Sequence, residues 1–309
     1  MRELSSFFEP PWPVPLTRPE FDRRPPFVAG LVPKALEGQP AWRLVERLGP
    51  FEADLARDLI EFGAFWVNGR PQPDPERALG QGQKFRVNWP RYGLERFYEP
   101  DPQRIVYQDE DVLVYDKESG LPSQAVPHDN YNNVVAGLGR LTGLELRLPH
   151  RLDLGTSGLL LLAKNKEAAS LLSQDFSRGQ VEKLYLALTP GEVPDWAEKT
   201  IVACVARAGR SYVVRAEGPG KPATTLLKVV AAMGGRILWA ARPATGRTHQ
   251  IRLHLAFAGY PILGDDFYGG EPYARLALRA LAFRFRRPGS REFLSLGPKE
   301  EELKELWPS

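Results

Sequence analysis

The feature that most constrains the fold is a run of five apolar residues, 159–163, that begins directly after a polar loop. A run this short, closed by a lysine and an asparagine, is typical of a buried β-strand. The loop before it, residues 150–158, reads His-Arg-Leu-Asp-Leu-Gly-Thr-Ser-Gly. It holds the Asp153 carboxylate at the edge of a rigid core, two residues after Arg151. This placement suits a functional carboxylate; the alternative is an arginine–aspartate pair that braces a turn.

The composition limits the classes of function that the chain can have. With 309 residues, 43% of them hydrophobic and 26% charged, it has the size and balance of a globular protein with one large and one small domain. The single cysteine, Cys204, excludes an intramolecular disulfide and a thiolate metal cluster, which fits a reducing cytosol. We find no signal peptide and no apolar segment of membrane-spanning length. The formal net charge of +3 arises within residues 96–309, where a surface for a polyanion is therefore expected first.

Three regions follow one another along the chain. Residues 1–38 are rich in proline and are expected to form an extended arm, because proline fixes φ and lacks an N–H donor. The aromatic residues Phe7, Phe8 and Trp12 could dock this arm on the body, or the arm could be disordered. Residues 39–95 are expected to form a small domain, and residues 96–309 a large one.

Residues 39–95 carry a helix, helix, turn and strand pattern. Apolar residues have helical spacing within 42–48 and again within 55–60, and Gly63 is placed to end the second helix in a left-handed conformation. An Asn-Gly turn and a strand over 84–89 follow. This order resembles the alpha-L RNA-binding domain of ribosomal proteins and of many RNA-modifying enzymes. The second helix is usually basic in that family, but here it carries Asp54, Arg57, Asp58 and Glu61. RNA contact through this helix is therefore left open.

The large region opens with a predicted β-hairpin. Residues 105–117 contain two β-type runs around an acidic turn, and Gly-Leu-Pro-Ser follows at 120–123. A short amphipathic helix is expected over 166–178. The alternating run 181–188 predicts a strand that places Lys183 and Tyr185 on one face. Taken alone, this tyrosine fits a half-buried residue of the core.

The last motif, residues 246–256, reads Gly-Arg-Thr-His-Gln-Ile-Arg-Leu-His-Leu-Ala, and a Gly-Asp pair follows at 264–265. The motif predicts a helix in which Arg252 lies one turn from His249. Its inner face is expected to carry Thr248, Ile251, Leu255 and Phe257. His249 and His254 are five residues apart, which does not stack them on one helical face, and no cysteine or acidic triad accompanies them. We therefore expect satisfied structural histidines and no metal site.

These motifs agree in order and spacing, over about residues 100–309, with the RluA-type pseudouridine synthases, whose HRLD-x-x-TSG loop carries the essential aspartate. The resemblance implies an α+β fold. Its large sheet would be mixed, mainly antiparallel and flanked by helices and loops, with the small α+β domain preceding it. Two positions depart from the family pattern. Glu118 replaces a proline, and Arg279 stands where histidine is common, so we assign Arg279 no role.

The resemblance also implies the chemistry of the site. Asp153 would be the nucleophile or the base that begins glycosidic cleavage, Tyr185 would lie against the uracil, and Arg252 would keep Asp153 ionised. Arg151 would enter the RNA stack from which the target nucleotide has flipped out. Further contacts to RNA are predicted for His150, Lys183 and Arg247. The isomerisation needs no cofactor and no metal.

The sequence thus predicts an isomerase that converts specific uridines of structured RNA into pseudouridine. Large-subunit (23S) ribosomal RNA is the favoured substrate, because relatives with an added alpha-L domain tend to modify it, and transfer RNA is the alternative. A non-catalytic RNA-binding or ribosome-assembly protein on this scaffold would be expected to lack Asp153, Arg252 or Tyr185, and all three are present. A glycosidase-like hydrolase would need paired carboxylates. We expect the protein to be a cytoplasmic monomer.

Overall fold

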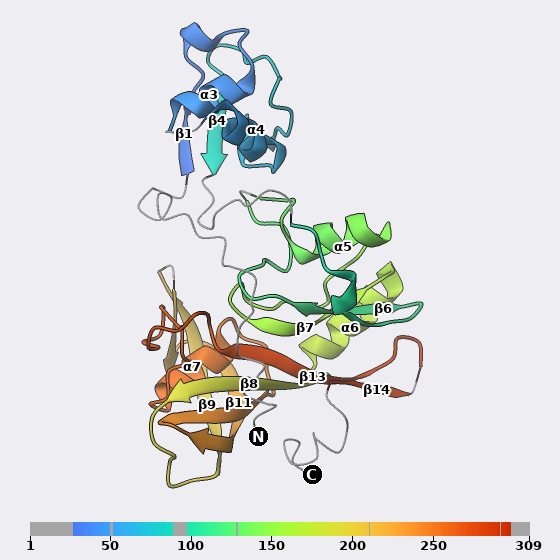
Figure 1. Ribbon diagram of the computed structural model, residues 1–309, viewed down its shortest axis with the longest axis vertical. Coiled ribbons are helices and arrows are strands. Elements are labelled where there is room, and N and C mark those ends of the chain that lie inside the picture. Colours follow the sequence, from blue (N-terminus) through green and yellow to red (C-terminus); the bar gives the residue numbers. More distant parts are fainter. Residues whose placement is uncertain are drawn as a thin grey trace. The chain divides into compact units, whose positions relative to one another are not determined.

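The computed structural model describes residues 27–49, 52–88, 98–127, 129–209, 211–290 and 292–297 (Figure 1). Within them the chain divides into two compact units. The N-terminal unit runs up to residue 100 and also includes residues 122–144. The large unit consists of residues 101–121 together with those from 145 onward. The predicted arm lies outside the described residues up to residue 26, so its docking or disorder stays a prediction.

The N-terminal unit is a four-stranded antiparallel sheet with short helices. Its elements are β1 (Phe27–Leu31), η2 (Lys34–Leu36), α3 (Ala41–Arg47), α4 (Ala53–Glu61), β2 (Phe65–Val67), β3 (Arg70–Pro71), β4 (Lys84–Asn88) and α5 (Val134–Thr142). The strand order is β1-β4-β2-β3. Strand β1 falls within the segment that the sequence assigned to the extended arm. It is a strand because its backbone pairs with β4 along all five residues, a contact that local sequence does not reveal.

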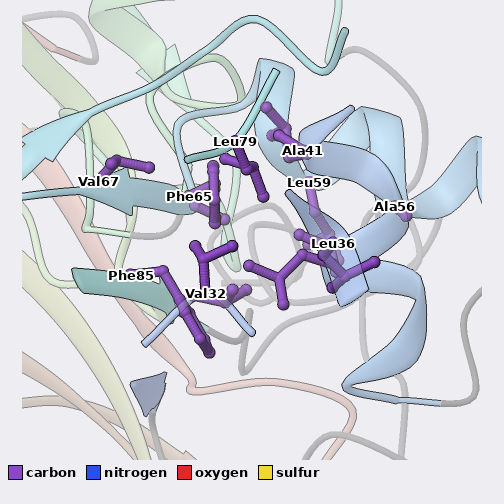
Figure 2. Close-up of a cluster of buried hydrophobic side chains, with 14 of the residues drawn as sticks. Val32, Leu36, Ala41, Ala56, Leu59, Phe65, Val67, Leu79 and Phe85 are labelled. Atoms are coloured by element: carbon purple, nitrogen blue, oxygen red, sulfur yellow. The ribbon is translucent and has the colours of Figure 1, made fainter. Parts of the chain in front are cut away.

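The core of this unit lies between the helices and one face of the sheet. Both helices bury their apolar side chains there, as their helical spacing predicts. Figure 2 shows Leu59 of α4 gathered with Phe65 and Phe85 of the strands. Two turns also form as their residues predict: Gly63 ends α4 with φ 89°, and the Asn-Gly turn at 68–69 has positive φ at both positions.

The large unit is built on ten strands. Its elements are η3 (Pro102–Arg104), β5 (Ile105–Gln108), β6 (Val112–Lys117), β7 (Ser157–Ala163), α6 (Lys166–Ser177), β8 (Glu182–Pro190), β9 (Glu198–Ala208), β10 (Ser211–Arg215), β11 (Lys221–Met233), β12 (Arg236–Pro243), α7 (Gln250–Phe257), β13 (Leu278–Arg286) and β14 (Phe293–Leu296). The strands form one sheet in the order β10-β9-β11-β12-β8-β13-β7-β6-β5, and β14 pairs with β13.

All pairs of this sheet are antiparallel except β13 with β7, which is parallel. The predicted fold class, α+β with a large mixed and mainly antiparallel sheet, is therefore confirmed. Sequence-distant strands meet at its centre, where β8 and β7 flank β13 (Figure 1). This crossing brings the loop before β7, the middle of β8 and the segment before β13 to one part of the sheet.

Strand β7 is the predicted apolar run, and all seven of its residues are buried. Burial on both faces explains why its side chains do not alternate between polar and apolar. The parallel pairing with β13 covers only Ser157 and Gly158. Further along, the N–H of Leu161 donates instead to Nε2 of His150, at 3.1 Å. The strand is thus tied back to the loop that precedes it. Among the described residues, no helix is long and apolar enough to cross a membrane.

Candidate active site

The loop that carries Asp153 is held tightly where it joins β7. The N–H of Thr156 donates to the Asp153 carbonyl at 3.1 Å, which closes a turn. Gly158 follows with φ 99°, and a Cβ there would overlap the backbone of Ala280 in β13. The motif therefore needs glycine at this position, because strands β7 and β13 approach too closely here for any side chain. The Asp153 side chain, 32% exposed, projects from a rigid support toward solvent.

A buried lysine supports the same loop from behind. Lys117 ends strand β6 and has no exposed surface. Its ammonium donates to the carbonyl of Leu154 at 3.2 Å, and to those of Glu118 and Leu121 at 2.7 and 2.8 Å. Burial lowers the pKa of Lys117 to about 7, although the charges of Glu118, Asp153 and Asp116 oppose this shift. The lysine thus fixes the residue next to Asp153 and places a titratable charge within range of its carboxylate.

The imidazole of His249 lies close to the Asp153 carboxylate. Its Nε2 lies 3.9 Å from Oδ2 of Asp153, and its Nδ1 lies 2.7 Å from the hydroxyl oxygen of Tyr268. The residue precedes α7 with φ 57°, a left-handed conformation that is uncommon for a residue other than glycine. Burial lowers the pKa of His249, Asp153 opposes this shift, and Arg252 adds to it. The imidazole is therefore neutral at pH 7.

Arg252 binds a different carboxylate from the one that the sequence suggested. Its guanidinium donates through Nε and one terminal nitrogen to the two oxygens of Asp265, both at 2.7 Å. Both side chains are buried, at 7% and 0% exposed. Burial by itself would lower the pKa of Arg252, but the hydrogen bond and charge of Asp265, followed by the charge of Asp153, raise it. Arg252 thus acts on Asp153 through its charge, while its hydrogen bonds hold Asp265.

Tyr185 lies in the middle of β8 and is 9% exposed. Burial raises the pKa of its hydroxyl, and the negative charge of Asp153 raises it further. The tyrosine is therefore protonated at neutral pH and lies within electrostatic range of the carboxylate. The strand predicted over 181–188 is observed, although Leu184 and Leu186 on its other face are buried as well. The sequence suggested a half-buried tyrosine, but Tyr185 is almost fully buried because both faces of the strand are covered.

The four other predicted RNA contacts fall in different environments. Arg151 is exposed beside Asp153. Lys183 is buried, its Nζ lies 3.4 Å from the Thr245 carbonyl, and burial lowers its pKa to about 8. Arg247 is half-buried and donates to the Pro222 carbonyl at 3.0 Å. His150 differs from all three because its ring faces inward.

The imidazole of His150 is a structural element of the core. It stacks on Phe176 with a ring-centroid distance of 4.3 Å and meets the edge of Phe283 at 5.1 Å. Its Nε2 accepts from Leu161, and burial lowers its pKa to about 3. Its Nε2 is engaged inside the protein, and the residue is only partly buried. The RNA contact predicted for His150 therefore stays a prediction, in which Nε2 takes no part.

Helix α7 corrects two expectations about residues 246–256. The helix begins at Gln250, so Thr248 precedes it, and Phe257 is 48% exposed and does not belong to its inner face. The expectation of satisfied structural histidines does not hold for His254, which is fully buried with both ring nitrogens without a hydrogen bond among the described residues. His249 has a hydrogen-bond partner in Tyr268, but it also approaches Asp153. No group of three or more histidine, cysteine or acidic side chains in the described part of the chain is arranged to hold a metal.

Sequence reasoning missed three residues of the site: Lys117, His249 and Asp265. For Asp265, the Gly-Asp pair downstream of the motif was a visible signal, but its partner depends on how a loop folds over α7. For His249, the helical spacing of the motif gives no signal, because the residue precedes α7 and does not follow the geometry of the helix. For Lys117, a lysine that ends a strand gives no sign that its ammonium is buried.

The fold and site together define a class: an enzyme that presents one carboxylate, backed by a buried arginine and a protonated tyrosine, on a large mixed sheet. Comparison with known proteins agrees with this class. A family model described as RNA pseudouridylate synthase matches residues 111–257. An uncharacterised RNA pseudouridine synthase of Chlorobaculum parvum is 35% identical over 285 residues, covering 79% of this chain and 86% of the relative. The chain therefore belongs to the RNA pseudouridine synthase family.

Other relatives support the same assignment. The ribosomal large subunit pseudouridine synthase C of Escherichia coli is 35% identical over 217 residues, which cover 65% of this chain and 67% of that protein. The solved structure of human RNA pseudouridylate synthase domain containing 1 is 27% identical and superposes with a TM-score of 0.55, covering 68% of this chain and 89% of its own. The resemblance to the RluA-type enzymes, the activity and the fold class predicted from the sequence are confirmed. The alpha-L assignment of residues 39–95 and the roles of single residues stay predictions.

Proposed function

We propose that this enzyme isomerises specific uridines of large-subunit ribosomal RNA and that Asp153 begins the reaction. The observation that carries the proposal is the approach of His249 to the Asp153 carboxylate, at 3.9 Å, together with the electrostatic influence of Asp153 on Tyr185 and Arg252. The choice of RNA rests on the relatives named for the ribosomal large subunit. Transfer RNA is the second candidate substrate, and a mapping experiment distinguishes the two.

The proposed reaction rearranges bonds within one nucleotide. Asp153 attacks the ribose or abstracts a proton so that the bond from carbon 1′ to the uracil nitrogen breaks. The detached uracil turns and carbon 5 bonds to carbon 1′, while the bond from Asp153 to the ribose breaks or the proton that Asp153 took returns to the ribose. Asp153 is thereby regenerated, and the proton on carbon 5 leaves as the ring nitrogen gains one. Atoms and electrons balance without an external reactant. Tyr185, held protonated, lies against the uracil and offers its hydroxyl as a hydrogen-bond donor.

We assign the supporting residues as follows. The guanidinium of Arg252, held in place by Asp265, supplies the positive charge that acts on the Asp153 carboxylate. Neutral His249 positions the Asp153 carboxylate through its Nε2, while Tyr268 fixes the ring from its other side. Arg151, exposed beside Asp153, enters the RNA stack in place of the flipped nucleotide. Arg247 contacts the RNA backbone at the rim of the site, and Lys183, which is buried, attracts the backbone through its charge.

The setting of the reaction follows from the same features. We propose that the enzyme acts as a monomer. A free cysteine, Cys204, and a ribosomal substrate suit the cytoplasm. Sedimentation of the purified protein with and without RNA tests the monomer, since a stable dimer at assay concentrations contradicts it.

The direct test maps pseudouridine in total RNA from cells with and without the gene. We expect one or more sites in large-subunit ribosomal RNA to disappear with the gene and to return when the wild-type gene is restored. Restoration with Asp153→Asn should leave these sites unmodified. Loss of sites only in transfer RNA would overturn the proposed substrate. An unchanged pseudouridine map, together with defects of ribosome assembly in the cells without the gene, would favour the non-catalytic alternative.

A further inference from the structure

The N-terminal unit has an open sheet face whose chemistry differs from that of its helical side. In β1, Val28 and Gly30 face the core, because they pair with Val87 and Phe85 of β4. The alternate side chains face outward on the opposite side of the sheet. Figure 2 shows Phe85 packed in this core together with Phe65 and Val67 of β2. The outward set consists of Phe27, Ala29, Leu31, Trp66, Lys84 and Arg86, and we call it the outer sheet face.

Charge is distributed unequally between the two sides of this unit. The four strands carry Arg70, Lys84 and Arg86, and no acidic residue. Helix α4 carries three acidic side chains against one arginine. A polyanion is therefore attracted to the strands and repelled by α4. In the alpha-L family the second helix is usually basic. Here that helix is acidic, and the basic side chains lie on the strands instead.

The outer sheet face also holds a preassembled pair of a cation and an aromatic ring. The guanidinium carbon of Arg86 lies 4.0 Å from the ring centroid of Phe27, and its Nε donates to Oδ1 of Asn88 at 2.9 Å. These contacts orient the planar guanidinium before any ligand arrives. Phe27 is still 41% exposed and Leu31 60% exposed. Trp66, directly opposite Arg86 on β2, adds a half-buried indole.

From this face we propose that the N-terminal unit binds single-stranded RNA on the outer sheet face and not along α4. Unpaired bases stack on exposed aromatic rings, and the arginine and lysine between them contact the phosphates, a combination that tolerates any sequence. The partner is RNA because the charge of the strands is wholly positive and because the family acts on RNA. The inference thus builds on the proposed function and assigns it a second contact surface.

The test measures binding of a fluorescein-labelled oligoadenylate of about 12 nucleotides to the full-length protein by fluorescence anisotropy over a range of salt. This probe contains no uridine, so its binding does not depend on the isomerisation or on recognition of the target base. We expect the double variant Phe27→Ala/Arg86→Ala to bind about tenfold more weakly. Lys84→Gln should lower the slope of log affinity against log salt by about 0.7, the value for one phosphate contact to a single strand.

The matched control is Arg47→Ala in α3, which removes one exposed positive charge from the helical side. We expect it to bind the probe as the wild type does. Arg86→Lys keeps the charge, and it should keep the salt slope while losing part of the affinity that comes from the oriented guanidinium. Circular dichroism of each variant verifies that the unit is folded, and the single exposed change Lys84→Gln remains informative if the double variant is not.

Three outcomes overturn the inference. The first is wild-type affinity and salt slope in the folded Phe27→Ala/Arg86→Ala variant. The second is a larger loss in Arg47→Ala, which would place RNA on the helices. The third is a change of sedimentation without a change of affinity, which would make the face a contact between copies of this chain. Failure of the proposed function would give a different result. The wild-type protein would then release no tritium from RNA labelled at uridine carbon 5 but would still bind oligoadenylate.

Discussion

Two carboxylates, Asp153 and Asp265, act on the same arginine but are treated in opposite ways by the fold. Asp265 has no exposed side-chain surface and accepts four hydrogen bonds, two from Arg252 and two from the backbone N–H groups of Phe267 and Tyr268. Asp153 is 32% exposed, and among the described residues His249 approaches its carboxylate only to 3.9 Å. The carboxylate of Asp265 is fully hydrogen-bonded and holds the guanidinium of Arg252 in place. The other is left with free lone pairs that a substrate can meet.

The sharpest test of this difference is Asp153→Asn. The amide keeps the shape of the carboxylate but is neither a nucleophile nor a base, so we expect tritium release from carbon-5-labelled uridine in RNA to fall by a factor on the order of 10⁴ or more. Because the side chain is partly exposed, the free energy of unfolding should change by no more than about 0.5 kcal/mol. Denaturant unfolding and single-turnover tritium release measure the two quantities. Substantial remaining activity would remove Asp153 from its assigned role.

Asp265→Asn should behave in the opposite way. It leaves the buried guanidinium of Arg252 without its counter-charge, which costs about 3–5 kcal/mol of folding free energy. Activity should fall too, because the charge behind Asp153 is no longer held in place. Adding Arg252→Met to Asp265→Asn removes the orphaned charge and should recover part of the stability but not the activity. Stability of the single variant close to that of the wild type would mean that the two carboxylates do not differ as the structure indicates.

Acid titration examines how the Asp153 loop is anchored. The pKa of His150 is lowered to about 3 in the folded state, against 6.5 for an exposed histidine. Between these values the unfolded chain binds a proton that the folded chain does not, so stability falls as pH drops from about 6.5 toward 3. The loss should reach a few kcal/mol. Chemical unfolding at a series of pH values measures it.

His150→Phe supplies the control for this titration. Phenylalanine keeps the ring contacts with Phe176 and Phe283 but cannot accept the Leu161 N–H. We expect it to cost about 1–3 kcal/mol at pH 7 and to flatten the dependence on pH below 6.5. An equally steep decline in the variant would assign the acid sensitivity to other groups, of which buried His254, with a pKa lowered to about 4, is the next candidate.

The contrast between Asp153 and Asp265 also shows what the sequence could predict. The apolar run after the loop predicts buried strand β7, and the polar loop itself marks Asp153, because both depend on neighbouring residues. The pairing of Arg252 with Asp265 depends on a loop thirteen positions downstream that folds back over α7, and charge alone does not choose between two aspartates. Likewise β1 is a strand because β4, more than fifty residues away, pairs with it. Local sequence patterns predict the helices, the strands and the reactive carboxylate. Which side chains and strands pair with one another depends on long-range packing.

The smallest predicted effect concerns His249, which touches the open carboxylate. Asn is well tolerated at positive φ, so His249→Asn keeps the backbone before α7 while it removes the ring. Because Asp153 loses its positioning contact, we expect tritium release at pH 7.5 to fall about 10–100-fold with RNA affinity unchanged. Tyr268→Phe cuts only the hydrogen bond to Nδ1 and should lose several-fold.

The pH profile separates positioning by His249 from a general loss of structure. Burial lowers the pKa of His249, so the ring gains a proton only at a more acidic pH than an ordinary histidine does. The protonated ring would form an ion pair with Asp153 and withdraw electron density from its oxygens, so wild-type turnover should decline as pH falls and the ring gains this proton. In His249→Asn this component of the acid decline should be missing, which a purely structural role would not produce. If the variant retains the pH profile of the wild type at a lower rate, His249 does not act on Asp153 and its role is structural.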